Sequence, residues 1–271
     1  MKQTAWKIYV LMRREFLEEF SYKFNFILEI LTILTLSSIF YFISKIFTGG
    51  TTPVLASYHG DYFSFVLIGL AFTGYINTGL SAFTATIRNE QMLGTLEFII
   101  STPTSISLIL FSRLLWKFFY STINASIFFI FGIIFLNASY TNVNYPAIPV
   151  IVVMSVIAFN GLGMISAGFI LIFKRGDPIN MLLGFAASLL GGVFFPIEVL
   201  PSILQKISAF IPITYALRLM RNACIRGYSM RELMPDMLIL FVLCVLFAAI
   251  GYLFFSYAVK RTRMDGTLSH Y

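Results

Sequence analysis

Six long apolar stretches, separated by short polar segments, make up most of this 271-residue chain. An α-helix needs about 20 largely apolar residues to cross a hydrocarbon core about 30 Å thick. A charge at the centre of such a helix costs on the order of 2.5 to 3.5 kcal/mol, and the six stretches carry very few. The pattern predicts an all-α fold with six transmembrane helices, at residues 24–44, 62–87, 106–136, 148–173, 179–195 and 237–259.

The first 23 residues mix charged and apolar positions and predict a helix that lies at the membrane interface. Its apolar side holds Trp6, Val10, Leu17 and Phe20, and its polar side holds Lys7, Arg14, Glu15 and Glu18. The first apolar stretch begins late and is longer than the about 7 to 15 residues of a secretory signal, so we expect no cleavable targeting peptide.

A second amphipathic segment, Arg88 to Pro103, lies between the second and third spans, within a connection that we place at 88–105. As a helix it presents Met92, Leu96, Ile99 and Ile100 on one face, with Arg88, Glu90, Gln91, Thr95 and Glu97 on the rest. Such a helix at a membrane surface is typical of a contact with a partner.

Three prolines, Pro196, Pro201 and Pro212, interrupt the region 196–236 that precedes the last span. Proline removes a backbone donor and clashes with the preceding turn, so one continuous helix cannot contain all three. The piece from Ile197 to Phe210 is too short to cross the bilayer. Two interpretations remain open, a re-entrant helical hairpin and an ordinary extracellular loop with one amphipathic helix.

The charge distribution orients the six spans. Hydrophobic residues form 58% of the chain and charged residues 11%, against about 25% charged in an ordinary soluble domain. With both termini on one side, that side holds 13 of the 19 basic residues: Lys2, Lys7, Arg13, Arg14, Lys23, Arg88, Arg113, Lys117, Lys174, Arg175, Lys260, Arg261 and Arg263. The positive-inside rule therefore places both termini, including the tail 260–271, in the cytoplasm.

Four arginines, Arg218, Arg221, Arg226 and Arg231, run against this orientation. The net charge of +7 is accounted for by basic rims that face anionic lipid, and no nucleic-acid partner is needed. We expect a multi-pass protein of the plasma membrane.

Few residues offer catalytic or metal chemistry. The chain has no GxxxxGK[ST] loop for ATP, and its two histidines, His59 and His270, are far from any set of carboxylates or cysteines. Cys224 and Cys244 are interpreted as packing residues. Glu29 is almost the only ionisable residue deep in a span, and we expect it to pair with Arg113 or Lys117. The sequence predicts neither a catalytic site nor a metal site.

Two motifs carry a resemblance to a known family. They are the run with Glu90, Gly94-Thr-Leu-Glu97 and Thr102-Pro103, and the run Phe-Pro196 … Leu-Pro201 … Ile-Pro212-Ile-Thr-Tyr215 … Leu-Arg218. Together they resemble the membrane subunit of an ABC-2-type transporter, in order over nearly the whole chain. The resemblance implies a type V exporter in which two membrane subunits form the path. Two copies of a separate cytoplasmic ATPase would bind ATP and Mg²⁺.

The resemblance also implies residue roles. The coupling helix that contacts the ATPase would contain Arg88, Glu90, Gly94, Thr95, Leu96, Glu97, Thr102 and Pro103, and the N-terminal helix with Arg14 would be the connecting helix. Pro196, Glu198, Pro201, Pro212 and Tyr215 would belong to an extracellular re-entrant gate. The path would lie between the second and fifth spans, with Thr73, Asn77, Ser81 and Ser188 as candidate lining residues.

The entry segment resembles the drug and antibiotic efflux branch, which implies an amphiphilic or lipid-like cargo. The resemblance over nearly the whole chain implies a single domain over 1–271. The second membrane subunit would be another copy of this chain or a paralogous permease. Export of polysaccharide or glycolipid by the same family remains an alternative, as does a secondary carrier that needs no ATPase. The ABC exporter and the secondary carrier differ in whether transport requires a partner ATPase with a Walker motif.

Overall fold

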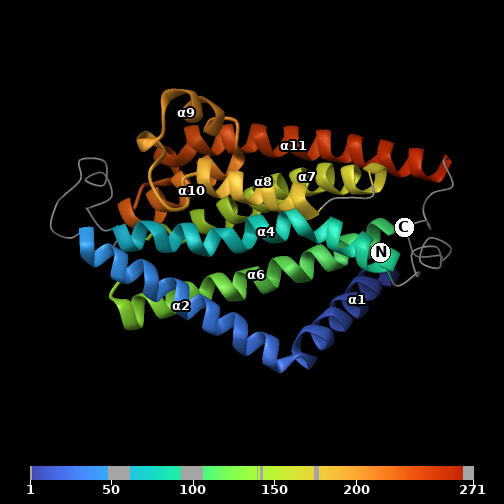
Figure 1. Cartoon of the computed structure of the whole chain (residues 1–271), viewed down its shortest axis with the longest axis horizontal. Helices are drawn as coiled ribbons and strands as arrows, with labels where there is room; N and C mark the ends of the chain where they lie inside the picture. Colours follow the sequence, from blue (N-terminus) through green and yellow to red (C-terminus); the bar gives the residue numbers. More distant parts are fainter. Residues whose placement is uncertain are drawn as a thin grey trace.

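The computed structural model describes residues 2–47, 62–92, 106–138, 140, 143–173 and 177–264, and within them the regular elements are all helical (Figure 1). Five of these helices are long and apolar enough to cross a membrane. They are α2 (Lys23–Phe47), α4 (Tyr62–Met92), α6 (Ile106–Leu136), α7 (Ala147–Phe173) and α11 (Met230–Met264). The first four and the last of the predicted spans are confirmed as helices.

The fifth predicted span, 179–195, is wrong in extent. Helix α8 (Asp177–Leu190) has 14 residues. At about 1.5 Å per residue this length is about 21 Å, which is less than a hydrocarbon core of about 30 Å. The helix stops because the chain turns at Gly192, whose φ of +78° is a left-handed conformation that glycine adopts without strain. The expected topology of six full spans is therefore not confirmed.

Helix α11 begins at Met230, earlier than the predicted start at residue 237. The Glu232 side chain caps this end, because both the backbone N–H and the hydroxyl of Ser229 donate to Glu232 Oε2 over 2.7 Å, which is the carboxylate half of a capping box. Pro235 lies early in the helix and does not end it. The Ser-x-x-Glu spacing is visible in the sequence and could have given this boundary.

Helix α4 is the centre of the bundle and runs through the middle of the view in Figure 1. It contacts α2, α6, α7, α8 and α10. Phe65, Leu67, Ile68 and Phe72 are all but fully buried, although they lie on different sides of the helix. A helix that is apolar all round requires neighbours on every side, and this burial fixes α4 as the element around which the others pack.

Helices α7 and α11 cross closely because each has a glycine at the crossing. A Cβ atom on Gly251 would lie 2.3 Å from the carbonyl oxygen of Gly161, which is impossible without movement of the backbone. Small residues at helix crossings let two backbones approach, and this is a principal source of helix association in a bilayer.

Helix α1 (Lys2–Ser21) confirms the predicted N-terminal helix. The chain changes direction at Tyr22, and α1 and α2 form a V below the rest of the molecule in Figure 1. Helix α1 packs on α6. Figure 1 also shows that α1 begins and α11 ends at the same end of the molecule.

The chain after α8 is broken at each of the three prolines, as predicted. Pro196 precedes the 3₁₀-helix η1 (Ile197–Val199), Pro201 precedes α9 (Ser202–Ser208), and Pro212 is the first residue of α10 (Pro212–Arg221). A π-helical turn, η2 (Asn222–Arg226), follows and ends at Gly227. These short elements lie at the end of the bundle opposite to α1's first turn (Figure 1).

Candidate functional site

One face of α6 forms a ladder of polar contacts with α1 and α2. Arg113 Nε lies 2.9 Å from Glu15 Oε1, and one turn further Lys117 Nζ lies 3.0 Å from Glu19 Oε2. The edge of one ring meets the face of the other where Phe16 contacts Trp116, with ring centroids 5.5 Å apart. Residues four apart lie on the same face of a helix, so the two ion pairs join α1 to α6 along one line.

Glu29 occupies the next position on this ladder. The hydroxyl of Tyr120 donates to Glu29 Oε2, and Asn124 Nδ2 donates to Glu29 Oε1 over 2.6 Å. The expectation that Glu29 pairs with Arg113 or Lys117 is wrong, because α1 turns back along α6 and its own carboxylates take both cations. The sequence gives no signal of this exchange.

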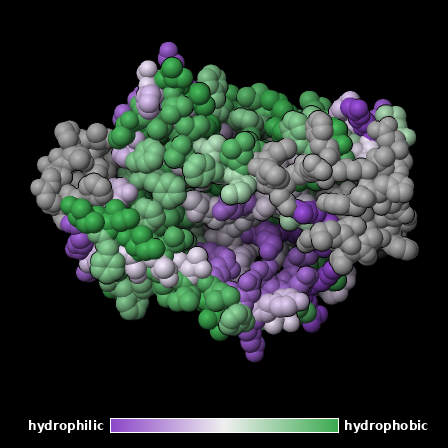
Figure 2. Space-filling view, in the orientation of Figure 1, coloured by the Kyte–Doolittle hydropathy of each residue, from purple (hydrophilic) through white to green (hydrophobic). Residues whose placement is uncertain are grey.

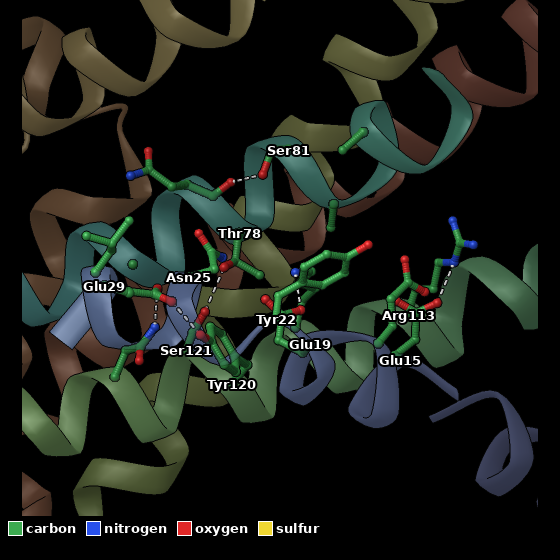
Figure 3. A pocket seen from close by; sticks show the side chains of 18 of the residues that line it. Glu15, Glu19, Tyr22, Asn25, Glu29, Thr78, Ser81, Arg113, Tyr120 and Ser121 are labelled. Carbon is green, nitrogen blue, oxygen red and sulfur yellow. Dashed lines mark hydrogen bonds and ion pairs between the residues drawn. The ribbon is translucent and has the colours of Figure 1, made fainter. Parts of the chain in front are cut away.

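The ladder forms one wall of a large cavity between α1, α2, α4 and α6, with a volume of about 1030 Å³. Figure 3 shows Glu29, Thr78, Tyr120 and Ser121 converging on one region of it, with Glu15, Glu19 and Arg113 further toward α1. Figure 2 shows hydrophilic side chains gathered in a hollow of the surface beside α1. The lining residues are Arg14, Glu15, Glu18, Glu19, Tyr22, Asn25, Leu28, Glu29, Thr32, Gly74, Asn77, Thr78, Ser81, Ala82, Ala85, Arg113, Lys117, Tyr120, Ser121 and Asn124.

Two of the four candidate path residues line this cavity and two do not. Asn77 and Ser81 lie on the cavity face of α4, together with Thr78, which shares a 2.6 Å hydrogen bond with Ser121 of α6. Thr73 donates to the carbonyl of Leu70 over 2.6 Å, and Ser188 of α8 donates to the carbonyl of Gly184 over 2.8 Å. The structure thus joins Asn77 and Ser81 with residues of α1, α2 and α6 that the sequence analysis did not assign to the path.

The predicted coupling residues fall partly inside the described part of the chain. Arg14 of α1 is exposed and lines the mouth of the cavity. Arg88 and Glu90 lie in the last turns of α4, which continues to Met92 without a break at residue 87. The others, Gly94, Thr95, Leu96, Glu97, Thr102 and Pro103, lie outside the described residues.

Two of the five candidate gate residues, Pro196 and Glu198, line a smaller cavity of about 200 Å³ at the other end of the bundle. Thr214, Arg218 and Arg221 line it as well. Tyr215 is buried in α10, and the Arg218 guanidinium lies 5.1 Å from the centre of its ring. Pro201 and Pro212 start the two helices α9 and α10 that hold this region.

Arg221 is a residue that the sequence analysis did not single out for a role. It is only 4% exposed, and its guanidinium donates to the carbonyls of Phe65 over 3.3 Å and Val193 over 3.1 Å. It also lies 3.4 Å from the centre of the Phe65 ring. The residue therefore ties α10 to α4 and to the turn after α8. Its position among four arginines that oppose the charge bias was the available signal.

Two of the other three arginines that oppose the charge bias also have contacts within the protein. Arg218 pairs with Asp236 of α11 over 3.2 Å, and Arg226 Nη1 lies 3.3 Å from the Tyr228 hydroxyl. Both arginines therefore have partners within the protein.

Both cysteines are free and buried, as expected for packing residues. Burial in η2 raises the pKa of the Cys224 thiol to about 12, so the thiol stays protonated at neutral pH.

Comparison with known protein families gives a match over most of the chain. The family model described as ABC-2 type transporter matches residues 7–225, from α1 to the π-helical turn η2. No curated protein matches the chain.

Proposed function

This chain belongs to the ABC-2 type transporter family, and we propose that it is the permease of an exporter that moves an amphiphilic substrate out of the cell with ATP as the energy source. As a family member with several membrane-length helices, it is a membrane permease component of an ABC transporter. The direction of transport, the class of substrate and the use of a separate ATPase are among the parts that we propose.

The observation that carries the proposal is the polar cavity between α1, α2, α4 and α6. It extends from the charged helix α1 to Glu29, six residues into α2, and its volume of about 1030 Å³ is at the upper end of the roughly 300–1,000 Å³ of ligand pockets. On α2, the flanking side chains Leu28 and Leu31 are 43% and 56% exposed. A cavity with polar walls and an apolar rim inside a membrane suits a molecule that has both a polar and an apolar part.

Energy would come from a separate ATPase that contacts the segment from Arg88 to Pro103. Helix α1, the proposed connecting helix, would also transmit a movement, because two ion pairs and the Phe16–Trp116 contact fasten it to α6. A displacement of α1 would therefore act on the wall of the cavity. Loop and domain movements that open and close a site in this way are common in ligand-driven machines.

The remaining parts of the proposal concern the second subunit and the gate. Met181, Leu182 and Phe185 of α8 are 80%, 68% and 64% exposed, which supports coverage of this face by a second copy of the chain or by lipid. The broken segment of η1, α9 and α10 would close the outer end of the path as a re-entrant gate. Both termini would face the cytoplasm of the plasma membrane.

Purification from the native membrane in mild detergent tests the proposal. We expect a soluble ATPase with a Walker motif to co-purify near one-to-one, and the charge reversal Glu97→Arg to reduce both its recovery and ATP-driven efflux at least tenfold. Arg231→Glu, an exposed charge reversal in the first turn of α11 and outside the proposed gate, is the matched control and should leave both unchanged.

Recovery of the chain alone, with transport in liposomes driven by an ion gradient and no ATP, would overturn the proposal. It would favour the secondary carrier, for which Glu29 is the ionisable group inside a span.

A further inference from the structure

We propose that the cavity between α1, α2, α4 and α6 binds the positively charged group of a cationic amphiphile, with Glu29 as its counter-ion. The inference rests on the proposed export function and specifies the substrate class. It follows from the ladder on α6, in which the third position lacks the cation that the first two possess.

The ladder has three carboxylates along one face of α6. Glu15 faces Arg113 and Glu19 faces Lys117, so the first two positions are neutral as pairs. At the third position the partners of Glu29 are a hydroxyl and an amide, from Tyr120 and Asn124. Two neutral donors orient a carboxylate and do not cancel its charge.

The charges of the whole lining give the same result. The cavity is lined by four carboxylates, Glu15, Glu18, Glu19 and Glu29, and by three basic residues, Arg14, Arg113 and Lys117. Glu15 and Glu19 are paired with Arg113 and Lys117 in the ladder. Glu18 and Arg14 are exposed and one turn apart on α1, where solvent screens them. The negative charge left over is that of Glu29, at the inner end of the cavity.

The position of Glu29 along α2 strengthens its attraction for a cation. Glu29 is six residues after the start of α2 at Lys23, which corresponds to about 9 Å along the helix. Electrostatic attraction is stronger there than in bulk water because the surroundings have a lower effective dielectric constant. The amide oxygen of Asn124 is also buried and has no hydrogen-bond partner among the described residues, so the third position retains polar capacity that the fold does not use.

The cavity favours an organic cation over a metal ion or an anion. Its volume of about 1030 Å³ is far larger than a coordination sphere, and no group of three His, Cys, Asp or Glu side chains within the described residues is arranged to hold a metal. An anion would meet the Glu29 carboxylate. The rings of Tyr22 and Tyr120 in the lining supply aromatic surfaces that attract organic cations.

Equilibrium binding of two probes of nearly equal shape and opposite charge tests the inference. The purified complex is dialysed without ATP against radiolabelled tetraphenylphosphonium or tetraphenylborate. We expect the cation to bind at least tenfold more tightly, and Glu29→Gln to weaken cation binding about tenfold or more without weakening binding of the anion. Glu232→Gln, which removes a carboxylate outside the cavity, is the matched control and should change neither.

A second variant tests the same idea without removing the carboxylate. Asn124→Lys places a cation at the third position and should form an ion pair with Glu29 like that between Lys117 and Glu19. We expect this variant to fold, to retain its ATPase partner, and to lose preference for the cation. Glu29→Asp should retain that preference.

Equal binding of the two probes, or a cation preference that survives both Glu29→Gln and Asn124→Lys, would overturn the inference. Recovery of the ATPase is scored separately in each preparation. A complex with its ATPase but without Glu29-dependent cation binding refutes only the inference. Glu29-dependent binding in a chain that recovers no ATPase supports the inference and refutes the proposed function.

Discussion

Arg221 provides the sharpest test of how the outer end of the bundle is held together. The change Arg221→Met keeps much of the aliphatic volume and removes the guanidinium. Its two hydrogen bonds to carbonyls, at 3.3 and 3.1 Å, and its contact with the Phe65 ring at 3.4 Å are lost together. These contacts join α10 to α4 and to the turn after α8, so the effect should extend beyond one helix.

The magnitude follows from burial. Hydrogen bonds from a charged donor contribute about 1.5–3 kcal/mol each, and a desolvated cation–π contact about 2 kcal/mol. The methionine variant also regains the several kcal/mol spent on desolvating the guanidinium. The net expected loss is about 3 kcal/mol in the free energy of unfolding. At about 2–4 °C per kcal/mol for a chain of this size class, the melting temperature should fall by about 6–12 °C.

The assay is thermal unfolding of the purified protein in detergent, followed by tryptophan fluorescence or by size-exclusion chromatography of heated samples. Arg218→Met, three residues earlier on the same helix, is the control. Its side chain is 44% exposed and pairs with Asp236, so the expected loss is at most about 1 kcal/mol. Equal shifts for the two variants would refute the argument that burial of Arg221 stabilises this region.

Three further predictions concern other parts of the molecule. Burial raises the pKa of the Cys224 thiol to about 12, and the change Cys244→Ala leaves Cys224 as the cysteine that maleimide can label. This thiol should resist maleimide at pH 8 until the protein is denatured, and its labelling rate should rise as the pH approaches 12. Rapid labelling of the native protein at pH 8 would contradict this. Gly251→Val should strongly reduce the yield of folded protein, since its Cβ would lie 2.3 Å from the Gly161 oxygen, whereas Gly74→Ala, where nothing lies within 4 Å, should match wild type in size-exclusion yield. In double-mutant cycles of thermal stability, the Glu15–Arg113 pair, 14% exposed on both sides, should show a larger coupling than the Glu19–Lys117 pair, whose lysine is 41% exposed; the reverse order would show that exposure does not set these energies.

The sequence was sufficient for the elements whose formation depends on local rules. In a bilayer a helix must satisfy its own backbone groups, so long apolar runs predicted α2, α4, α6, α7 and most of α11. Proline has no backbone donor, so the three breaks after α8 followed from Pro196, Pro201 and Pro212 alone. Family membership was predicted in the same way, from motifs that are continuous in the chain, and the family match supports it.

Tertiary structure decided the contacts between elements distant in sequence. Any of several carboxylates could meet Arg113 and Lys117, and the reversal of the chain at Tyr22 gave these cations to Glu15 and Glu19 and left Glu29 with Tyr120 and Asn124. The burial of Arg221 likewise depends on the packing of α10 against α4 and the turn after α8. Local pattern determines whether a segment is a helix, whereas the partner of each charge depends on which helices are neighbours in space, and that information is absent from any single stretch of sequence.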